Sequence, residues 1–277
     1  MQRRAQFSSD AQKSLFDQAK FTEGLVRCQE LLTELRTRDP RQADIGHLLY
    51  ERAGFQRMSG DLDGAIATMH ETLAFDLATE GEVSWNTFKS LSTLARFNIL
   101  AGHHELAEQL IRRGLAALNQ LPMEEQDERY VFLMNLADIY SSRGQLREAE
   151  LQILEALRLV GRNYWADSLG AVCFELSWIY MRQHRLVAAR RTMQKAIRFF
   201  ERTERHRLNE LKLGRMYYHL GRLHQRMNEP AEARQCFAAS LAVSQSFPPL
   251  DDPRRIRWEK VCRERLADLE EALVTMP

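Results

Sequence analysis

Side chains that could carry out catalysis are few and scattered in this sequence. His103, His104 and Glu105 come closest to a metal-ligand cluster, but they are consecutive residues at an expected helix-to-helix turn, where neighbouring side chains diverge. No phosphate-binding loop, dinucleotide-binding glycine pattern, zinc-protease motif, nucleophile elbow or calcium loop is present. The sequence therefore predicts a protein that is not an enzyme and has no metal site and no cofactor.

The chemistry that does stand out is recognition of anions. Residues 181–234 contain 14 basic and 5 acidic residues, an excess of nine positive charges, whereas residues 40–130 contain 8 basic and 14 acidic residues. The whole chain has a formal net charge of only +1, which argues against direct nucleic-acid binding. We predict an uneven charge distribution that favours an acidic partner.

One segment gathers this chemistry on a single expected helix face. Tyr218, Arg222 and Arg226 follow Arg215 at three, seven and eleven positions, which places all four side chains on one side of a helix. Guanidinium groups suit carboxylate or phosphate, and Arg and Tyr contribute strongly to binding at interfaces. The alternative is an ordinary solvated helix face.

The bulk composition predicts a folded protein in a reducing compartment. Of the 277 residues, 44% are hydrophobic and 28% charged, a balance that supports a core. No apolar run reaches the roughly 18 residues that a membrane span needs, and residues 1–10 lack the apolar segment of a signal peptide. We predict a cytoplasmic protein without membrane attachment or disulfides, since the cysteines are widely spaced: Cys28, Cys173, Cys236 and Cys262.

The elements that would position these side chains repeat along the chain. One helical phrase recurs at intervals of 41, 42, 42, 40 and 44 residues, starting at Ala19, Gly60, Gly102, Gly144, His184 and Asn228. Each copy has a small residue five positions later, followed by apolar residues at three- and four-residue steps, the pattern of an amphipathic helix.

Ahead of each phrase except the first lies a second helical pattern. It contains a small residue twelve positions before the small residue of the phrase. The pairs are Ala53 and Ala65, Ala95 and Ala107, Ala137 and Ala149, Ser177 and Ala189, and Gly221 and Ala233. Two facing small side chains let a helix hairpin close tightly. We predict one domain over 1–277, with an N-terminal helix pair at 8–38, hairpins at 45–78, 86–120, 129–160, 168–202 and 210–246, and a capping helix at 253–275.

Two hairpins resemble the signature of the tetratricopeptide repeat family, through Leu136, Ala137, Tyr140, Ala149, Ile153 and Ala156, and through Leu176, Ser177, Tyr180, Ala189, Met193 and Ala196. The resemblance implies an all-α, right-handed superhelical solenoid of antiparallel hairpins. Arg52, Gln56, Asn98 and His224 depart from the family pattern. The period exceeds the usual 34 residues and is similar to that of kinesin light chains and bacterial peptide-sensing regulators.

In this family the first helix of each hairpin lines a concave groove. The resemblance therefore implies a scaffold or adaptor that binds a protein or peptide there. The candidate partner-binding residues are Lys89, Arg96, Asn135, Trp178, Arg182, Arg215, Tyr218, Arg222 and Arg226. Further positions on the same faces are His47, Tyr50, Arg57, Asp138 and Phe174.

Two family-specific functions can be compared with the sequence. Chaperone-binding members grip a C-terminal carboxylate, and Lys89 and Asn135 match two of the required positions, but Glu175 at another would repel a carboxylate. We therefore predict no chaperone clamp. Residues 83–133 resemble the sensor repeats of MalT-type transcription activators, so the alternative function is a regulatory module that senses a peptide or a small-molecule ligand.

Overall fold

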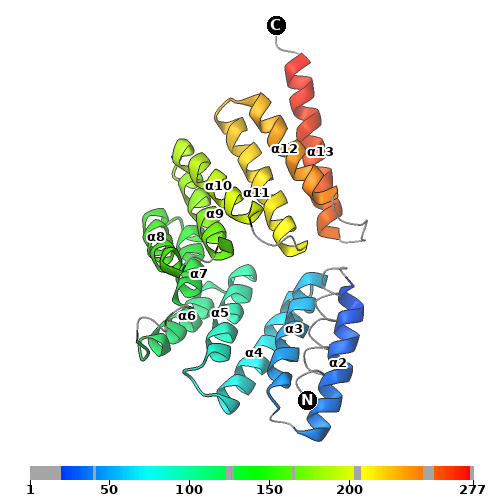
Figure 1. Ribbon diagram of the computed structural model, residues 1–277, viewed down its shortest axis with the longest axis vertical. Coiled ribbons are helices and arrows are strands. Elements are labelled where there is room, and N and C mark those ends of the chain that lie inside the picture. The colour runs from blue at the N-terminus through cyan, green and yellow to red at the C-terminus, as the bar shows by residue number, and fades with distance from the viewer. Residues whose placement is uncertain are drawn as a thin grey trace. The chain divides into compact units, whose positions relative to one another are not determined.

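Every element that the structure describes is an α-helix. The computed structural model describes residues 20–39, 42–122, 126, 128–163, 166–202, 207–245 and 253–274. Its helices are α2 (Phe21–Arg38), α3 (Asp44–Ser59), α4 (Leu62–Thr79), α5 (Trp85–Leu100), α6 (His104–Leu118), α7 (Arg129–Ser142), α8 (Leu146–Asn163), α9 (Ala166–Arg182), α10 (Leu186–Glu201), α11 (Arg207–Arg226), α12 (Pro230–Gln245) and α13 (Pro253–Val274) (Figure 1). The predicted all-α fold class is confirmed, while the predicted helix before Lys20 lies outside the described residues.

The chain forms two compact units, residues 1–144 and 145–277, and each is described by itself. Unit 1 contains α2 to α7, and unit 2 contains α8 to α13. Consecutive helices pack as the pairs α3–α4, α5–α6, α9–α10 and α11–α12, and α13 packs on α12; the predicted hairpin bounds stay predictions. That all 277 residues form a single domain stays a prediction.

The hairpin turns fall on the residues where the repeated phrase begins. Gly60, Gly102 and Gly144 have φ angles of 96°, 82° and 79°, in the left-handed region that glycine enters without steric cost. His184 and Asn228 occupy the equivalent turns of unit 2 and take the same conformation, with φ of 61° and 60°. The left-handed residue ends the first helix of each hairpin and lets the chain reverse.

The small-residue pairs lie where two helices of a hairpin cross. In α9–α10 the Ser177 hydroxyl donates a hydrogen bond of 2.7 Å to the Ala189 carbonyl, and both residues are buried. In α11–α12 a Cβ added at Gly221 would lie 2.8 Å from the Phe237 ring. A larger residue at either crossing would force the helices apart.

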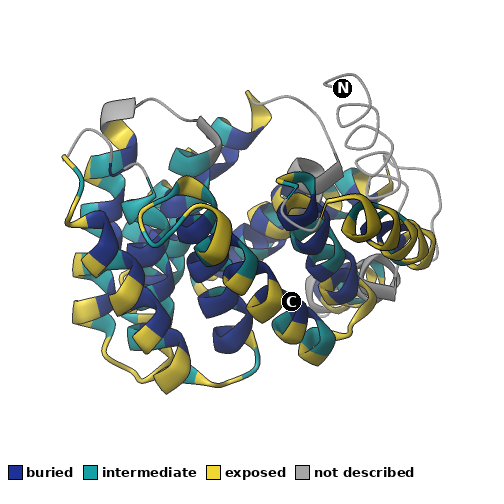
Figure 2. Cartoon of the chain, turned by 90° about the horizontal axis from the view of Figure 1, so that it is seen from below, coloured by how far each residue is buried: buried dark blue, intermediate teal, exposed yellow. Residues whose placement is uncertain are grey.

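First helices of successive hairpins also pack side by side, at a spacing of one repeat. In unit 1 the Tyr50 and Thr93 hydroxyls lie 3.3 Å apart between α3 and α5, and the Asn135 amide of α7 donates to the Ser92 carbonyl at 2.9 Å. The residues of both pairs are 43 positions apart. Figure 2 shows the buried residues on helix sides that face other helices, and the exposed residues on outer sides and at helix ends.

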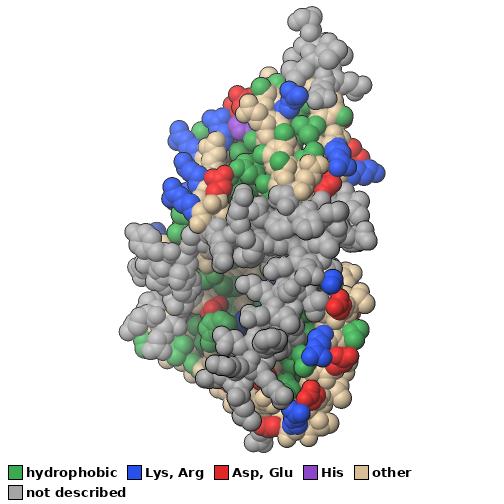
Figure 3. Space-filling model, turned by 45° about the vertical axis from the view of Figure 1, so that its right-hand side comes forward, with side chains coloured by type: hydrophobic (Ala, Val, Ile, Leu, Met, Phe, Trp, Pro, Cys, Tyr) green, Lys and Arg blue, Asp and Glu red, His purple; other side chains and the backbone are tan. Residues whose placement is uncertain are grey.

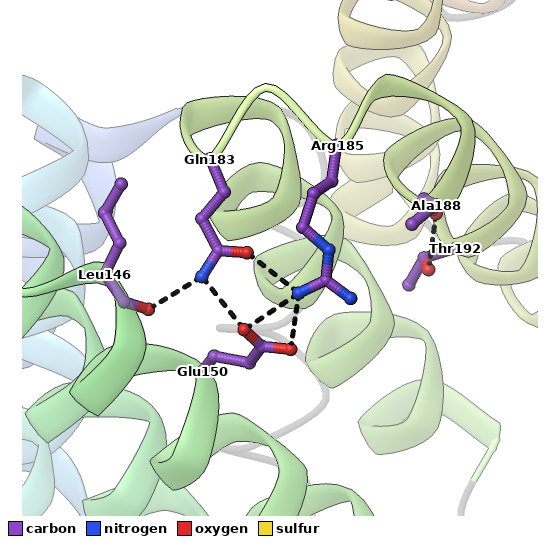
Figure 4. A network of polar contacts seen from close by, with 6 residues as sticks. All are labelled: Leu146, Glu150, Gln183, Arg185, Ala188 and Thr192. Atoms are coloured by element: carbon purple, nitrogen blue, oxygen red, sulfur yellow. Dashed lines mark hydrogen bonds and ion pairs between the residues drawn. The ribbon is translucent and has the colours of Figure 1, made fainter.

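Ion pairs join the second helices to the turns of following repeats. In unit 2 Glu150 accepts hydrogen bonds from Arg185 at 2.8 and 3.0 Å and from Gln183 at 2.9 Å, and Gln183 also donates to the Leu146 carbonyl (Figure 4). Burial would raise the pKa of Glu150, but the hydrogen bonds from Gln183 and Arg185 outweigh it and lower the pKa.

The same joint recurs elsewhere in the chain. In unit 1 Glu108 pairs with Arg143 at 2.8 Å, and in unit 2 the charges are exchanged, with Arg190 of α10 pairing with Glu229 at 2.9 Å. Isolated exposed pairs contribute about 0–1 kcal/mol each. They join neighbouring repeats and neutralise arginines at these joints.

Candidate functional site

In unit 2 the facing sides of α9 and α11 form a surface of aromatic rings and arginines. The His219 ring of α11 lies 5.0 Å from the Trp178 ring and 5.6 Å from the Phe174 ring, measured between centroids. The Arg215 guanidinium lies 5.2 Å from the centroid of the Phe174 ring. We call Phe174, Trp178, Arg215, His219 and Arg222 the α9/α11 face.

His219 is neutral at the centre of this face. Burial, together with the smaller effects of the charges of Arg215 and Arg222, lowers its pKa to about 3. Its Nδ1 atom is buried and has no hydrogen-bond partner among the described residues. The ring therefore contributes an uncharged aromatic surface between two cations.

Arg215 and Arg222 are both exposed and form no ion pair with any residue that the structure describes. Arg215 lies four residues before His219, and Arg222 lies three residues after it. All three side chains therefore share one side of α11. This pairing of unneutralised guanidinium groups with aromatic rings suits an acidic segment that also carries an apolar side chain.

The remaining basic residues predicted for this surface lie at its end. Arg226 donates to the Met181 carbonyl at 3.2 Å, and a second nitrogen of its guanidinium lies 3.3 Å from His184 Nδ1. Arg182, the last residue of α9, is exposed. Arg226 is therefore partly held by the α9 terminus.

Tyr218 was predicted to contact a partner, but little of its side chain is exposed. Its side chain is only 8% exposed and packs with Phe237 of α12, at a ring-centroid distance of 5.5 Å, in a cluster that includes Cys262 and Leu269 of α13. Position 218 is therefore part of the core against the last helices, although helical spacing places it on the same side as Arg222.

In unit 1 Lys89 is enclosed by aromatic rings. Its Nζ atom lies 3.7 Å from the centroid of the Tyr50 ring and 5.1 Å from that of the Trp85 ring. Burial lowers the pKa of Lys89, although Glu128, Glu51 and Asp76 act in the opposite direction. Lys89 thus lies on the predicted face but is already engaged by the protein's own side chains.

Two other predicted residues of unit 1 link α5 to α7. Arg96 pairs with Asp138 at 2.9 Å. Asn135, also predicted to contact a partner, is only 4% exposed and donates its amide to the Ser92 carbonyl. Compared with Arg215 and Arg222, the cations Lys89 and Arg96 are less available to a ligand.

The expected neighbours of these residues are also engaged in unit 1. His47 pairs with Glu51 at 3.1 Å, and this hydrogen bond, larger than the opposing effect of burial, raises the pKa of His47. The Arg57 guanidinium lies 5.9 Å from the Phe97 ring centroid. Neither arrangement leaves an unpaired cation of the kind seen at Arg215.

Sequence reasoning missed His219 and Trp85. His219 fits the series Arg215, His219, Arg222 at four- and three-residue steps, so helical spacing alone could have identified it. Trp85 is 58% exposed, and its indole donates to Glu128 at 3.0 Å. Trp85 lies one helical turn before Lys89, and this spacing alone could have predicted the contact between the Trp85 ring and Lys89.

The described residues contain no group of three or more His, Cys, Asp or Glu side chains that could hold a metal ion. His103 Nδ1 lies 3.3 Å from the Asn98 side-chain oxygen. All four cysteines are free thiols. Among the described residues, no helix is both long enough and apolar enough to cross a bilayer.

Comparison with known proteins finds one matching repeat and several chains of similar fold. The tetratricopeptide repeat model matches residues 214–247, which include most of α11 and all of α12. BtubC (BKLC) from P. vanneervenii has a similar fold, with a TM-score of 0.62 and 18% identity over 84% of this chain and 94% of that chain. Residues 214–247 thus match one tetratricopeptide repeat, and the chain as a whole shares the fold of this solved structure.

Two further solved structures share the fold. The kinesin light chain TPR-like repeats of Podosopora anserina align with a TM-score of 0.52 and 18% identity, over 78% of this chain and 97% of that one. Cut9, in its complex with Hcn1 from the APC/C, aligns with a TM-score of 0.60 and 15% identity, over 88% of this chain and 40% of that one. No curated protein matches the sequence.

Proposed function

We propose that the chain is a non-catalytic protein- or peptide-binding module, and that its α9/α11 face takes an acidic segment of the partner. Repeats of this kind present extended surfaces built from successive helices. The proposal rests on one observation: exposed Arg215 and Arg222, which no described carboxylate neutralises, flank the neutral His219 ring against Trp178.

The geometry indicates what the segment should contain. Arg215 and Arg222 are seven residues apart, about 10 Å along the helix axis. Two acidic side chains can therefore each meet one guanidinium. An apolar side chain between them would pack on His219 and Trp178, where aromatic surface supplies binding energy.

A peptide selection tests this proposal. A phage-displayed random peptide library is selected on the full chain, with counter-selection on the Arg215→Gln, Arg222→Gln double variant. We expect enriched peptides with two acidic residues around an apolar one. In fluorescence anisotropy, their affinity should fall about tenfold or more for each arginine removed, since each loses a charge-assisted hydrogen bond.

The matched control is Arg158→Gln with Arg263→Gln. Both residues are exposed arginines of unit 2 that pair within their own helices, so this variant removes the same charge away from the face. It should bind the selected peptides as the unmodified chain does. Equal binding by the Arg215/Arg222 variant, or enrichment without acidic residues, would disprove the proposal.

The alternative is a ligand- or peptide-sensing regulatory module, which rests on the resemblance of residues 83–133 to MalT-type sensors. Calorimetric titration with oligosaccharides and short neutral peptides separates the two functions. A sensor would bind such a small ligand directly, and this binding would not depend on Arg215 and Arg222.

A further inference from the structure

A second basic surface lies on α10, apart from the α9/α11 face. Three of its residues lie in α10 and the fourth is the C-cap residue that follows it. They succeed one another at steps of four, three and four, which places them on one side over about 16 Å. All four are exposed. We call this set the basic stripe: Arg191, Lys195, Arg198 and Arg202.

No carboxylate of a described residue pairs with any member of the basic stripe. The Lys195 Nζ atom lies 5.8 Å from the centroid of the Phe199 ring. Glu201, the sole acidic residue of α10, accepts a hydrogen bond of 2.6 Å from the Tyr217 hydroxyl. Figure 3 shows Lys and Arg side chains along one edge of unit 2, with Asp and Glu side chains among them.

Other exposed arginines of the described helices are neutralised where a partner is within reach. Arg27, Arg38, Arg112 and Arg158 each pair with a glutamate three or four residues away in the same helix. The only glutamate of α10, Glu201, lies three residues after Arg198 but bonds to the Tyr217 hydroxyl. Arg198 and Arg202 also lie at the helix C-terminus, where positive charge is favourable, but Arg191 and Lys195 do not.

The chemistry of the stripe favours a phosphate backbone over the other anionic partners. Every exposed residue from 191 to 202 is polar or charged, so the stripe offers none of the apolar anchors that stabilise protein interfaces. A helix that lies on a membrane inserts its apolar face, but that face of α10 is already buried in unit 2, with Met193, Ile197 and Phe200 in the core.

A nucleic-acid duplex needs only the charges. It carries about one negative charge per 1.7 Å of axis, so a straight row of four cations meets phosphates in any register. We propose that the basic stripe is a sequence-independent contact for the phosphate backbone of a nucleic-acid duplex. The low net charge of the whole chain does not oppose this contact, because the positive charge is local.

The test measures binding of a fluorescently labelled mixed-sequence DNA duplex to the full chain, by anisotropy, between 50 and 200 mM salt. Four phosphate contacts predict a slope of about −3.6 for log affinity against log salt, or an affinity loss on the order of 100-fold over this range. Replacing all four stripe residues with Gln should reduce the size of the slope by about three or more. Circular dichroism checks that the variant is folded.

The control replaces Arg27, Arg38, Arg112 and Arg158 with Gln, which changes the net charge by the same amount away from α10. It should keep the original slope, and so should the Arg215/Arg222 variant, so this proposal can fail or succeed independently of the peptide site. Equal slopes for the stripe variant and the unmodified chain would overturn the proposal. Stripe-dependent binding of phosphatidylserine vesicles or of a polyglutamate peptide, without duplex binding, would overturn it as well.

Discussion

Replacing His219 with Phe should make the protein less sensitive to acid. In the folded state, burial and the charges of Arg215 and Arg222 hold the pKa of His219 at about 3, against 6.5 for a free imidazole. Between these values the unfolded state binds more protons. The free energy of unfolding must therefore fall as the pH falls from 6.5 towards 3, and stay constant with respect to this group above 6.5.

The size of the effect follows from the two pKa values. Integration gives a loss of about 0.8 kcal/mol at pH 6 and about 2 kcal/mol at pH 5. The figure at pH 5 hardly changes for any folded-state pKa below about 4. It therefore tests whether His219 is kept neutral, and it does not depend on the particular pKa value.

Urea unfolding followed by circular dichroism at pH 7.5, 6 and 5 measures this loss. Phe keeps a ring against Trp178 and Phe174, and it removes only the titratable nitrogens, including the unpartnered Nδ1. At pH 7.5 the His219→Phe variant should be at least as stable as the unmodified chain. Its advantage should grow by about 2 kcal/mol at pH 5. Identical pH dependence of both proteins would refute the burial argument.

Three further predictions concern stability. Gly114→Ala should destabilise the protein, because its Cβ would lie 2.2 Å from the Phe132 ring and overpacking costs about 1–3 kcal/mol. Gly161→Ala, which meets nothing within 4 Å, should instead raise the free energy of unfolding by up to about 1 kcal/mol; urea midpoints of the two variants check the contrast. Burial raises the pKa of Asp76, which accepts a hydrogen bond from Ser90, so stability is lost as the pH rises through the raised pKa. Asp76→Asn should therefore raise the melting temperature at pH 8 but not at pH 3. The Gln variant of the basic stripe should gain about 0.2–0.5 kcal/mol for each like-charged neighbour pair at low salt, and a gain that persists in 1 M salt would contradict this reasoning.

The repeat could be predicted from the sequence because it depends on local geometry. A residue with left-handed φ must end the first helix of each hairpin, which explains why Gly60 and Asn228 mark the turns. Small residues must stand where helices cross, which explains Ser177 and Ala189. Each of these constraints acts within one hairpin, so its spacing is visible along the chain.

The candidate site was less predictable from the sequence. Helical spacing shows on which side of a helix a residue lies, but not which other helix packs against that side. Tyr218 and Arg222 are four residues apart in α11, yet Tyr218 is buried against α12 and α13 while Arg222 is exposed. Asn135 lies at a position predicted to face the groove, but its amide donates a hydrogen bond to the Ser92 carbonyl of the adjacent α5.

The sequence therefore determined the hairpins, their turns and the strong basic character of residues 181–234. Only the tertiary structure decided which cations remain available. Arg96 meets Asp138 on the next first helix and Lys89 meets two aromatic rings, whereas Arg215 and Arg222 meet no described carboxylate. The physical reason is that a charge is neutralised by groups within a few ångströms in space, and in a repeat protein those groups come from a neighbouring hairpin about 40 residues away.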